Sequence, residues 1–312
     1  MVQELLLWAE SRGYQVAWGP VEVLPLVRAD LEKRRNAGEI EPDFAQENLS
    51  FDLERAFSDA AFRRVLVIAM PRPAHLVTFT VAGRQIDAVL PPTYERYQPT
   101  FEDVRKDLVA HAIPASNVEH LNVPLKLLAS CLGLVRYGRN NLAYAPSIGS
   151  YMQLLGYLTD AELPIEPGWE PCEPCALDAC RGCRVCQSLC PTGAITPDRF
   201  LLRAECCLTL ANETARSWPP WVRPSAHRCL IGCLQCQRLC PANPGLAYAH
   251  SGVTFTAEET AVMLAGGDHR GPIWERVRMK LELLGQPYHE NVIGRNLHAL
   301  LRVREASGEM LE

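Results

Sequence analysis

"CRGCRVCQSLCPTGAI", residues 180–195, places four cysteines at intervals of two, two and three residues, and a proline follows the fourth. A shorter run, "CLQCQRLCP", spans residues 233–241 and repeats the last two intervals and the Cys-Pro ending. Leu230 stands where one more cysteine would complete the repeat. Closely spaced cysteines in a reducing compartment indicate metal or redox chemistry, so both runs predict that bound metal organises the middle of the chain.

The spacing of the longer run is the one that holds [4Fe–4S] clusters in bacterial ferredoxins, where the fourth cysteine serves the other of two clusters. It therefore predicts two crossed sets of thiols. The first set is Cys180, Cys183, Cys186 and Cys240. The second set contains Cys190, Cys233 and Cys236, and its fourth ligand is one of Cys206, Cys207 and Cys229.

Zinc is the alternative metal, since Cys172/Cys175 and Cys233/Cys236 are also C-x2-C pairs. Zinc does not account for an overlapping ladder of three thiols with two Cys-Pro endings, so the pattern favours two clusters. Cys172 and Cys175 exceed the ligands that two four-cysteine clusters need, and we expect them to be reduced thiols near the metal region.

The length of 312 residues is enough for two domains, and the formal net charge is −5. Twelve of the 13 cysteines lie between Cys172 and Cys240. The N-terminus has neither the basic segment nor the apolar run of a secretory signal, and no stretch reaches the roughly 18 apolar residues of a membrane span. We therefore expect a cytoplasmic protein without a membrane partner, in which thiols stay reduced.

The chain divides into three parts of an α+β protein. Residues 1–165 read as mixed α and β, residues 166–245 as the cluster domain, and residues 246–312 as a helical segment broken around Gly266 and Gly267. Within the first part, the sequence predicts these elements: a helix ending at Gly13, a buried strand over Val65–Met70, a hairpin over residues 75–90 that turns at Ala82 and Gly83, and a helix through Ala110 that Thr100 and Asp103 cap.

Basic residues are frequent in the tail. Between Arg270 and Arg304 there are seven Lys or Arg against three Glu, a net of +4. A solvated helical face is the simpler interpretation. The alternative is a surface for the phosphates of RNA or DNA, which cations bind with release of counterions.

These segments together resemble the epoxyqueuosine reductases, cobalamin-dependent iron–sulfur enzymes of tRNA queuosine synthesis that are related to reductive dehalogenases. The resemblance lies in the two cysteine runs, in "ECCLTLANE" (205–213) and, upstream, in "GLVRYGRNNL" (133–142) and "GSYMQLLGYLTDAELP" (149–164). It implies a nitroreductase-like α/β domain that holds cobalamin, followed by a ferredoxin-like double-cluster domain. It also implies that Cys206 is the remaining ligand of the second cluster.

By the same resemblance, two segments lie near the cobalamin. The residues at these positions are Gly133, Arg136, Tyr137, Gly138, Arg139, Asn140, Gly149 and Ser150. The segments also depart from the family: Val135 replaces a glycine, Arg136 an aromatic residue, Arg139 a lysine and Tyr157 a glutamate. The proton-donating aspartate of the family falls on Glu119, and the neighbouring His120 is an alternative donor because its ordinary pKa lies near neutrality.

Three functions follow. The first is reduction of epoxyqueuosine in tRNA, with electrons from a ferredoxin or flavodoxin and a tRNA contact on the basic tail, residues 270–304. The second is a paralogue that uses the same cofactors to reduce a corrinoid protein or a small molecule. The third is a dicluster electron-transfer protein without catalysis of its own. The sequence carries no signal for an oligomeric state.

Overall fold

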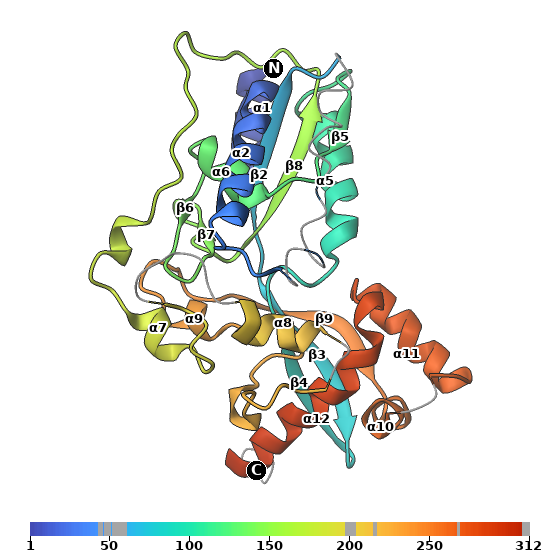
Figure 1. Cartoon of the computed structure of the whole chain (residues 1–312). Coiled ribbons are helices and arrows are strands. Elements are labelled where there is room, and N and C mark those ends of the chain that lie inside the picture. The colour runs from blue at the N-terminus through green and yellow to red at the C-terminus, as the bar shows by residue number, and fades with distance from the viewer. Residues whose placement is uncertain are drawn as a thin grey trace.

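The computed structural model describes residues 1–42, 46, 51, 61–196, 204–214, 217–266 and 269–307. Figure 1 shows the N-terminal α/β unit at the top, a second sheet with helices below it, and the cysteine-rich segments beside their junction. The N-terminus and helix α12 (Glu290–Ser307), the last described element, lie at opposite ends of the molecule. Every helix in these ranges is too short or too polar to cross a membrane.

A four-stranded antiparallel sheet forms the N-terminal unit. Its order is β1 (Gln15–Pro20), β2 (Arg64–Pro71), β8 (Met152–Thr159) and β5 (Val118–His120). The central strand β2 is buried on both faces, as its continuous apolar run predicts. Val65 and Val67 enter one core, while Leu66 and Ile68 enter the other, because successive side chains of a strand point to opposite faces.

Two pairs of helices cover this sheet. On one face lie α2 (Leu24–Asn36) and α6 (Leu125–Cys131); on the other lie α1 (Val2–Ser11) and α5 (Tyr97–His111). Helix α1 buries Leu5, Trp8 and Ala9, which share one face at helical spacing, and Gly13 follows at φ +67°. This agrees with the predicted helix end.

The predicted cap of α5 is wrong. The helix begins at Tyr97, and Thr100 lies inside its first turn, where its hydroxyl donates to the Arg96 carbonyl at 2.7 Å. Arg96 takes the N-cap position without a side-chain cap. The Thr-x-x-Asp pattern misled because a threonine within a helix can bond back to the preceding turn instead of capping it.

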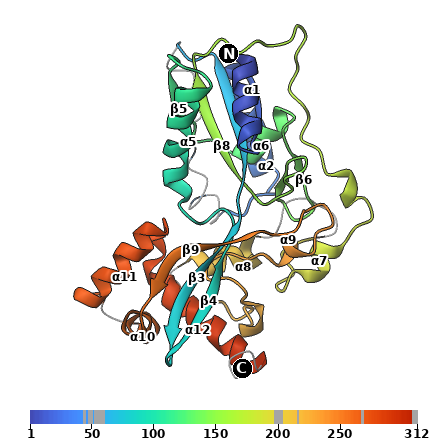
Figure 2. The ribbon, with the colours of Figure 1, turned by 180° about the vertical axis from the view of Figure 1, so that it is seen from behind.

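The predicted hairpin consists of β3 (Ala74–Val81) and β4 (Arg84–Leu90), and it joins a different sheet from β2. Strand β9 (Tyr248–Phe255) pairs parallel with β3, and a third core lies between this sheet and helices α10 (Ala257–Ala265), α11 (Pro272–Leu283) and α12 (Glu290–Ser307). Figure 2 shows the hairpin among these helices from behind. Residues 246–312 are thus not helical alone, since they begin with a strand.

Short elements carry the cysteines. They are the 3₁₀ turns Asp178–Cys180, Ala204–Cys206 and Pro224–Ala226, and the helices α7 (Val185–Leu189), α8 (Leu208–Glu213) and α9 (Gln235–Arg238). The small hairpin of β6 (Arg136–Tyr137) and β7 (Ala143–Tyr144) lies beside them. Further 3₁₀ turns span Val21–Val23 and Pro287–His289.

Candidate functional site

The first cysteine set comes together as the spacing predicts. Burial raises the pKa of the Cys186 thiol, and the neighbouring thiols of Cys180, Cys240 and Cys183 raise it further. Helix α7 packs against α9, which brings Cys240 to the three cysteines of the earlier run. A group of neighbouring thiols of this kind suits a cationic metal group, because bound metal removes the repulsion between thiolates.

The second cysteine set differs from the expectation at one position. Burial raises the pKa of Cys233 to about 11, with further contributions from Cys207 and Cys190. Cys190, Cys207, Cys233 and Cys236 line one cavity, and Cys206 is not among the described lining residues. The structure therefore places Cys207, in contrast to Cys206, beside the other members of the set.

The start of α8 explains this difference. Cys207 is the N-cap residue of the helix, and burial raises the pKa of its thiol while the backbone N–H groups of Leu210 and Thr209 oppose that effect. First-turn N–H groups have no partner within the helix, so they are available to a thiolate sulfur. Cys206 ends the preceding 3₁₀ turn and is buried.

The remaining cysteines are not among the described residues that line that cavity. Cys229 is buried with Ala74 and Leu234, and burial strongly raises its pKa. Cys172 and Cys175 are exposed. Within the described ranges, no three Cys, His, Asp or Glu side chains are arranged around one point to hold a single metal ion.

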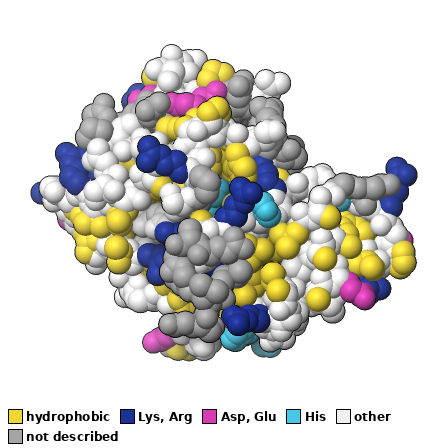
Figure 3. Space-filling view, turned by 90° about the horizontal axis from the view of Figure 1, so that it is seen from below, with side chains coloured by type: hydrophobic (Ala, Val, Ile, Leu, Met, Phe, Trp, Pro, Cys, Tyr) yellow, Lys and Arg dark blue, Asp and Glu magenta, His cyan; other side chains and the backbone are white. Residues whose placement is uncertain are grey.

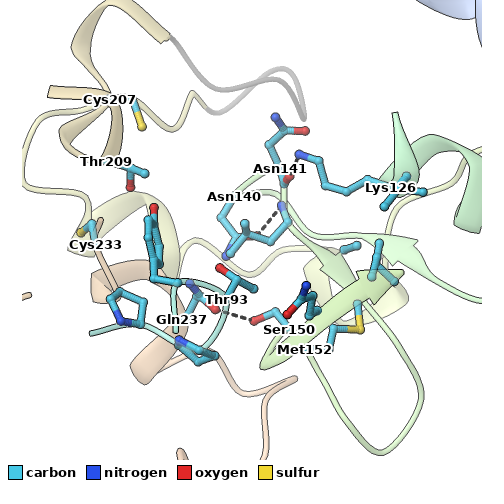
Figure 4. A pocket seen from close by; sticks show the side chains of 18 of the residues that line it. Thr93, Lys126, Asn140, Asn141, Ser150, Met152, Cys207, Thr209, Cys233 and Gln237 are labelled. Atoms are coloured by element: carbon cyan, nitrogen blue, oxygen red, sulfur yellow. Dashed lines mark hydrogen bonds between the residues drawn. The ribbon is translucent and has the colours of Figure 1, made fainter. Parts of the chain in front are cut away.

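A cavity of about 670 Å³ lies between the N-terminal unit and the cysteine region (Figure 4). In this view Cys207 and Cys233 lie on one side, and Lys126 reaches in from the other. Ser150 bridges the walls, since its hydroxyl is 3.0 Å from Oε1 of Gln237. The cavity thus has one wall from each part of the protein.

Of the residues expected near a cofactor, Tyr137, Asn140 and Ser150 line this cavity. The others support the surrounding loops. Arg139 donates to the carbonyls of Cys180 and Cys183, at 3.1 and 3.2 Å, and Arg136 forms a 2.9 Å ion pair with Asp178. Gly133, Gly138 and Gly149 lie in loops and are not among the residues that line the cavity. Gly133 and Gly149 have positive φ.

The two expected proton donors are separated by strand geometry. His120 lines the cavity, and its ring lies 4.1 Å from that of Phe101, measured between centroids. Glu119 precedes it on β5 and is not a lining residue. Successive residues of a strand point to opposite sides, so Glu119 and His120 face different sides of β5.

Lys126 is a cavity residue that the sequence reasoning missed. Its ammonium donates to the Asn141 carbonyl at 2.9 Å. The surrounding protein atoms lower its pKa to about 8, although the side chain keeps accessible surface because it borders the open cavity. The described lining contains no aspartate or glutamate, so apart from the cysteines and the Ser and Thr hydroxyls its protic groups are His120, Lys126 and tyrosines. The apolar positions of α6 gave no signal for such a lysine.

The basic tail is largely engaged within the protein. Arg276 and Lys280 pair with Glu259, and Arg278 pairs with Glu290. Arg295 lies 3.7 Å from the ring centroid of Trp218, and Arg304 donates to a backbone carbonyl. Figure 3 shows Lys and Arg side chains on one face in separate small groups and not in one continuous patch. These observations favour a structural role within the protein, and not phosphate binding, for most Lys and Arg residues of the tail.

Known proteins match both the cysteine region and the fold. A family model described as a 4Fe-4S double cluster binding domain matches residues 179–243. Epoxyqueuosine reductase from Staphylococcus aureus is 30% identical over 121 residues, 39% of this chain and 30% of that protein. The one from Pseudomonas aeruginosa is 27% identical over 181 residues, 58% of this chain and 47% of that protein. The aligned regions thus span less than half of these relatives.

Among solved structures, epoxyqueuosine reductase from Streptococcus thermophilus has a TM-score of 0.65 at 18% identity, covering 96% of this chain and 80% of that one. The Bacillus subtilis enzyme, with its aspartate catalytic loop swung out of the active site, has the same TM-score at 20% identity, covering 97% and 81%. The fold and the site thus define an α/β protein joined to a double [4Fe–4S] cluster domain.

Within that class the chain is similar to the epoxyqueuosine reductases, and the resemblance noted from the sequence is confirmed. The predicted fold class is confirmed as well, and the double cluster domain carries two [4Fe–4S] clusters.

Proposed function

We propose that this chain is a cobalamin-dependent iron–sulfur reductase that removes the epoxide oxygen of epoxyqueuosine in tRNA. The observation that carries the proposal is the cavity between the α/β unit and the second cysteine set. A reacting molecule there would lie next to a redox cluster. One solved relative binds an epoxyqueuosine-modified tRNA stem loop, which supports this substrate class.

The proposed cluster ligands follow the thiol positions. One set is Cys180, Cys183, Cys186 and Cys240; the other is Cys190, Cys207, Cys233 and Cys236, with Cys207 in the place expected for Cys206. The second set faces the cavity. The first set is absent from the described lining, so a ferredoxin or flavodoxin would deliver electrons on that side.

The lining also fits cobalamin. Its polar members are mostly amides and hydroxyls, namely Gln98, Asn122, Asn141, Gln153, Gln235, Gln237, Thr93, Ser150 and Thr209. The corrin ring carries amide groups around its edge, and an amide side chain can both donate to and accept from another amide. When bound, cobalamin supplies a strongly reducing metal centre for cleavage of the carbon–oxygen bond.

The residues of this chain supply binding and protons. Reduction of an epoxide to an alkene consumes an electron pair and protons, and the oxygen leaves as water. His120 and Lys126 are the protic groups placed to protonate that oxygen, in the role expected for Glu119. The apolar walls, which include Phe101 and Met152, limit the access of water to the reaction.

We propose that the tRNA substrate contacts the protein mainly around the cavity. In the tail, Arg302 is exposed at the protein surface, whereas most other cations of residues 270–304 have partners within the protein. We therefore assign the tail a minor part in binding tRNA phosphates.

A second candidate is a paralogue that reduces a corrinoid protein or a small molecule. The absence of a carboxylate from the described cavity lining favours it, since the solved Bacillus subtilis relative has an aspartate catalytic loop. A different acid at this position would suit a different electron acceptor.

Turnover separates the two candidates. Anaerobic protein loaded with iron, sulfide and cobalamin should convert epoxyqueuosine to queuosine in a tRNA anticodon stem loop, measured by nucleoside mass spectrometry. A His120→Gln, Lys126→Gln double variant that retains both cofactors should lose this activity. Parent protein that binds cobalamin but leaves the tRNA unchanged would support the second candidate.

A further inference from the structure

The β6–β7 hairpin contacts proposed ligands of both clusters. The Nδ2 atom of Asn140 donates to Sγ of Cys236 at 3.5 Å, and the Tyr144 hydroxyl donates to Sγ of Cys240 at 3.3 Å. The same amide nitrogen donates to the Tyr144 hydroxyl oxygen at 2.9 Å. A continuous hydrogen-bonded chain therefore runs from Cys236, in the second set, to Cys240, in the first.

Both donors are held in place. Asn140 and Tyr144 are 2% and 3% exposed. The amide oxygen of Asn140 accepts the N–H of Leu142 at 3.4 Å, which turns the amide nitrogen toward the sulfur. A Cβ at Gly138 would overlap both the ring of Tyr144 and the amide oxygen of Asn140, so glycine allows the hairpin to close over them. The hairpin thus presents its donors with little freedom.

Hydrogen bonds to ligand sulfurs are one of the factors that set cluster potentials. Reduction adds negative charge to a cluster, and a donor at the sulfur stabilises the more negative state more strongly. This effect is greatest where water is excluded, because the local dielectric is low. A donor to the sulfur therefore raises the reduction potential of its cluster.

We propose that Asn140 and Tyr144 are positioning residues that raise the reduction potentials of the two clusters, Asn140 chiefly at the second and Tyr144 chiefly at the first. The inference rests on the ligand sets given above but requires neither cobalamin nor tRNA. It also gives the hairpin a second role, since Asn140 lines the cavity as well.

The test is an anaerobic redox titration followed by electron paramagnetic resonance of the reconstituted protein. Tyr144→Phe keeps the ring and removes only the hydroxyl, and it should make the potential of the first cluster more negative. Asn140→Leu should do the same for the second cluster. The loss of one such hydrogen bond should change the ratio of oxidised to reduced cluster at a fixed potential by about threefold to tenfold.

Tyr157→Phe is the matched control. It removes a buried tyrosine hydroxyl that donates to the Phe101 carbonyl, away from both cysteine sets, and it should leave both potentials unchanged. If Tyr144→Phe and Asn140→Leu kept their full iron content and their clusters had the same reduction potentials as in the parent, the inference would be overturned. Parent protein without two clusters would instead refute the ligand sets of the proposed function, so the two failures are distinguishable.

Discussion

The thiol of Cys207 owes its position to the backbone around it. As the N-cap of α8 it lies near N–H groups that have no partner within the helix, and it shares the cavity wall with Cys190, Cys233 and Cys236. Cys206 carries the same functional group but ends a 3₁₀ turn and is not part of the described lining. Adjacent cysteines can thus differ in position because the direction of the backbone, and not the side chain, decides which one faces the cavity.

We expect Cys207→Ser to remove one of the two clusters, because a serine hydroxyl is a poor ligand for iron. Iron analysis of the anaerobically reconstituted variant should give about half the iron of the parent. Cys206→Ser is the matched control and should retain both clusters. The reverse result, with iron lost only from the Cys206 variant, would restore the ligand that the family resemblance implied.

Lys126 predicts a pH dependence. The surrounding protein atoms lower its pKa from 10.5 to about 8, so the ammonium form predominates at pH 7 and is lost as the pH rises through 8. If Lys126 supplies the proton, the single-turnover rate should fall across that range. Lys126→Gln should lower the rate by about 10²- to 10⁴-fold and abolish this decline. An unchanged profile in Lys126→Gln would leave His120 as the donor.

At the scale of elements, the sequence pattern predicted the buried strand β2, the β3–β4 hairpin and the end of α1, because each depends on local periodicity or on a glycine turn. It could not predict that β3 pairs with β9, more than 160 residues later, since strand pairing carries no local signal. The division at residues 165 and 245 stays a prediction. The third core shows, however, that the hairpin packs with the C-terminal helices.

Phe79 tests this arrangement. Its ring is fully buried on β3 and stacks on that of Phe255 from β9, with 4.9 Å between centroids. Phe79→Ala should destabilise the protein by about 3–5 kcal/mol through lost burial and the cavity left behind. The measurement is urea unfolding followed by circular dichroism. Phe79 variants as stable as the parent would argue against a shared core between the hairpin and the C-terminal segment.

At the scale of the whole molecule, the cysteine region joins two units that bury separate cores. Arg139 binds the first cysteine loop, while Asn140 and Tyr144 reach cysteines of both sets. The cysteine spacing predicted the double cluster domain because thiol ligands of a cubane follow local loop geometry. It could not predict Lys126 or the side of β5 that faces the cavity, since these depend on how the two units pack together.

Metal analysis of anaerobically purified protein, loaded with iron, sulfide and cobalamin and then freed of unbound cofactor, tests the central claim most directly. The proposal predicts about eight iron atoms and one cobalt atom per chain, since each four-cysteine set holds one cubane and the cavity holds one cobalamin. Stoichiometric zinc with little iron, or full iron without cobalt, would contradict it.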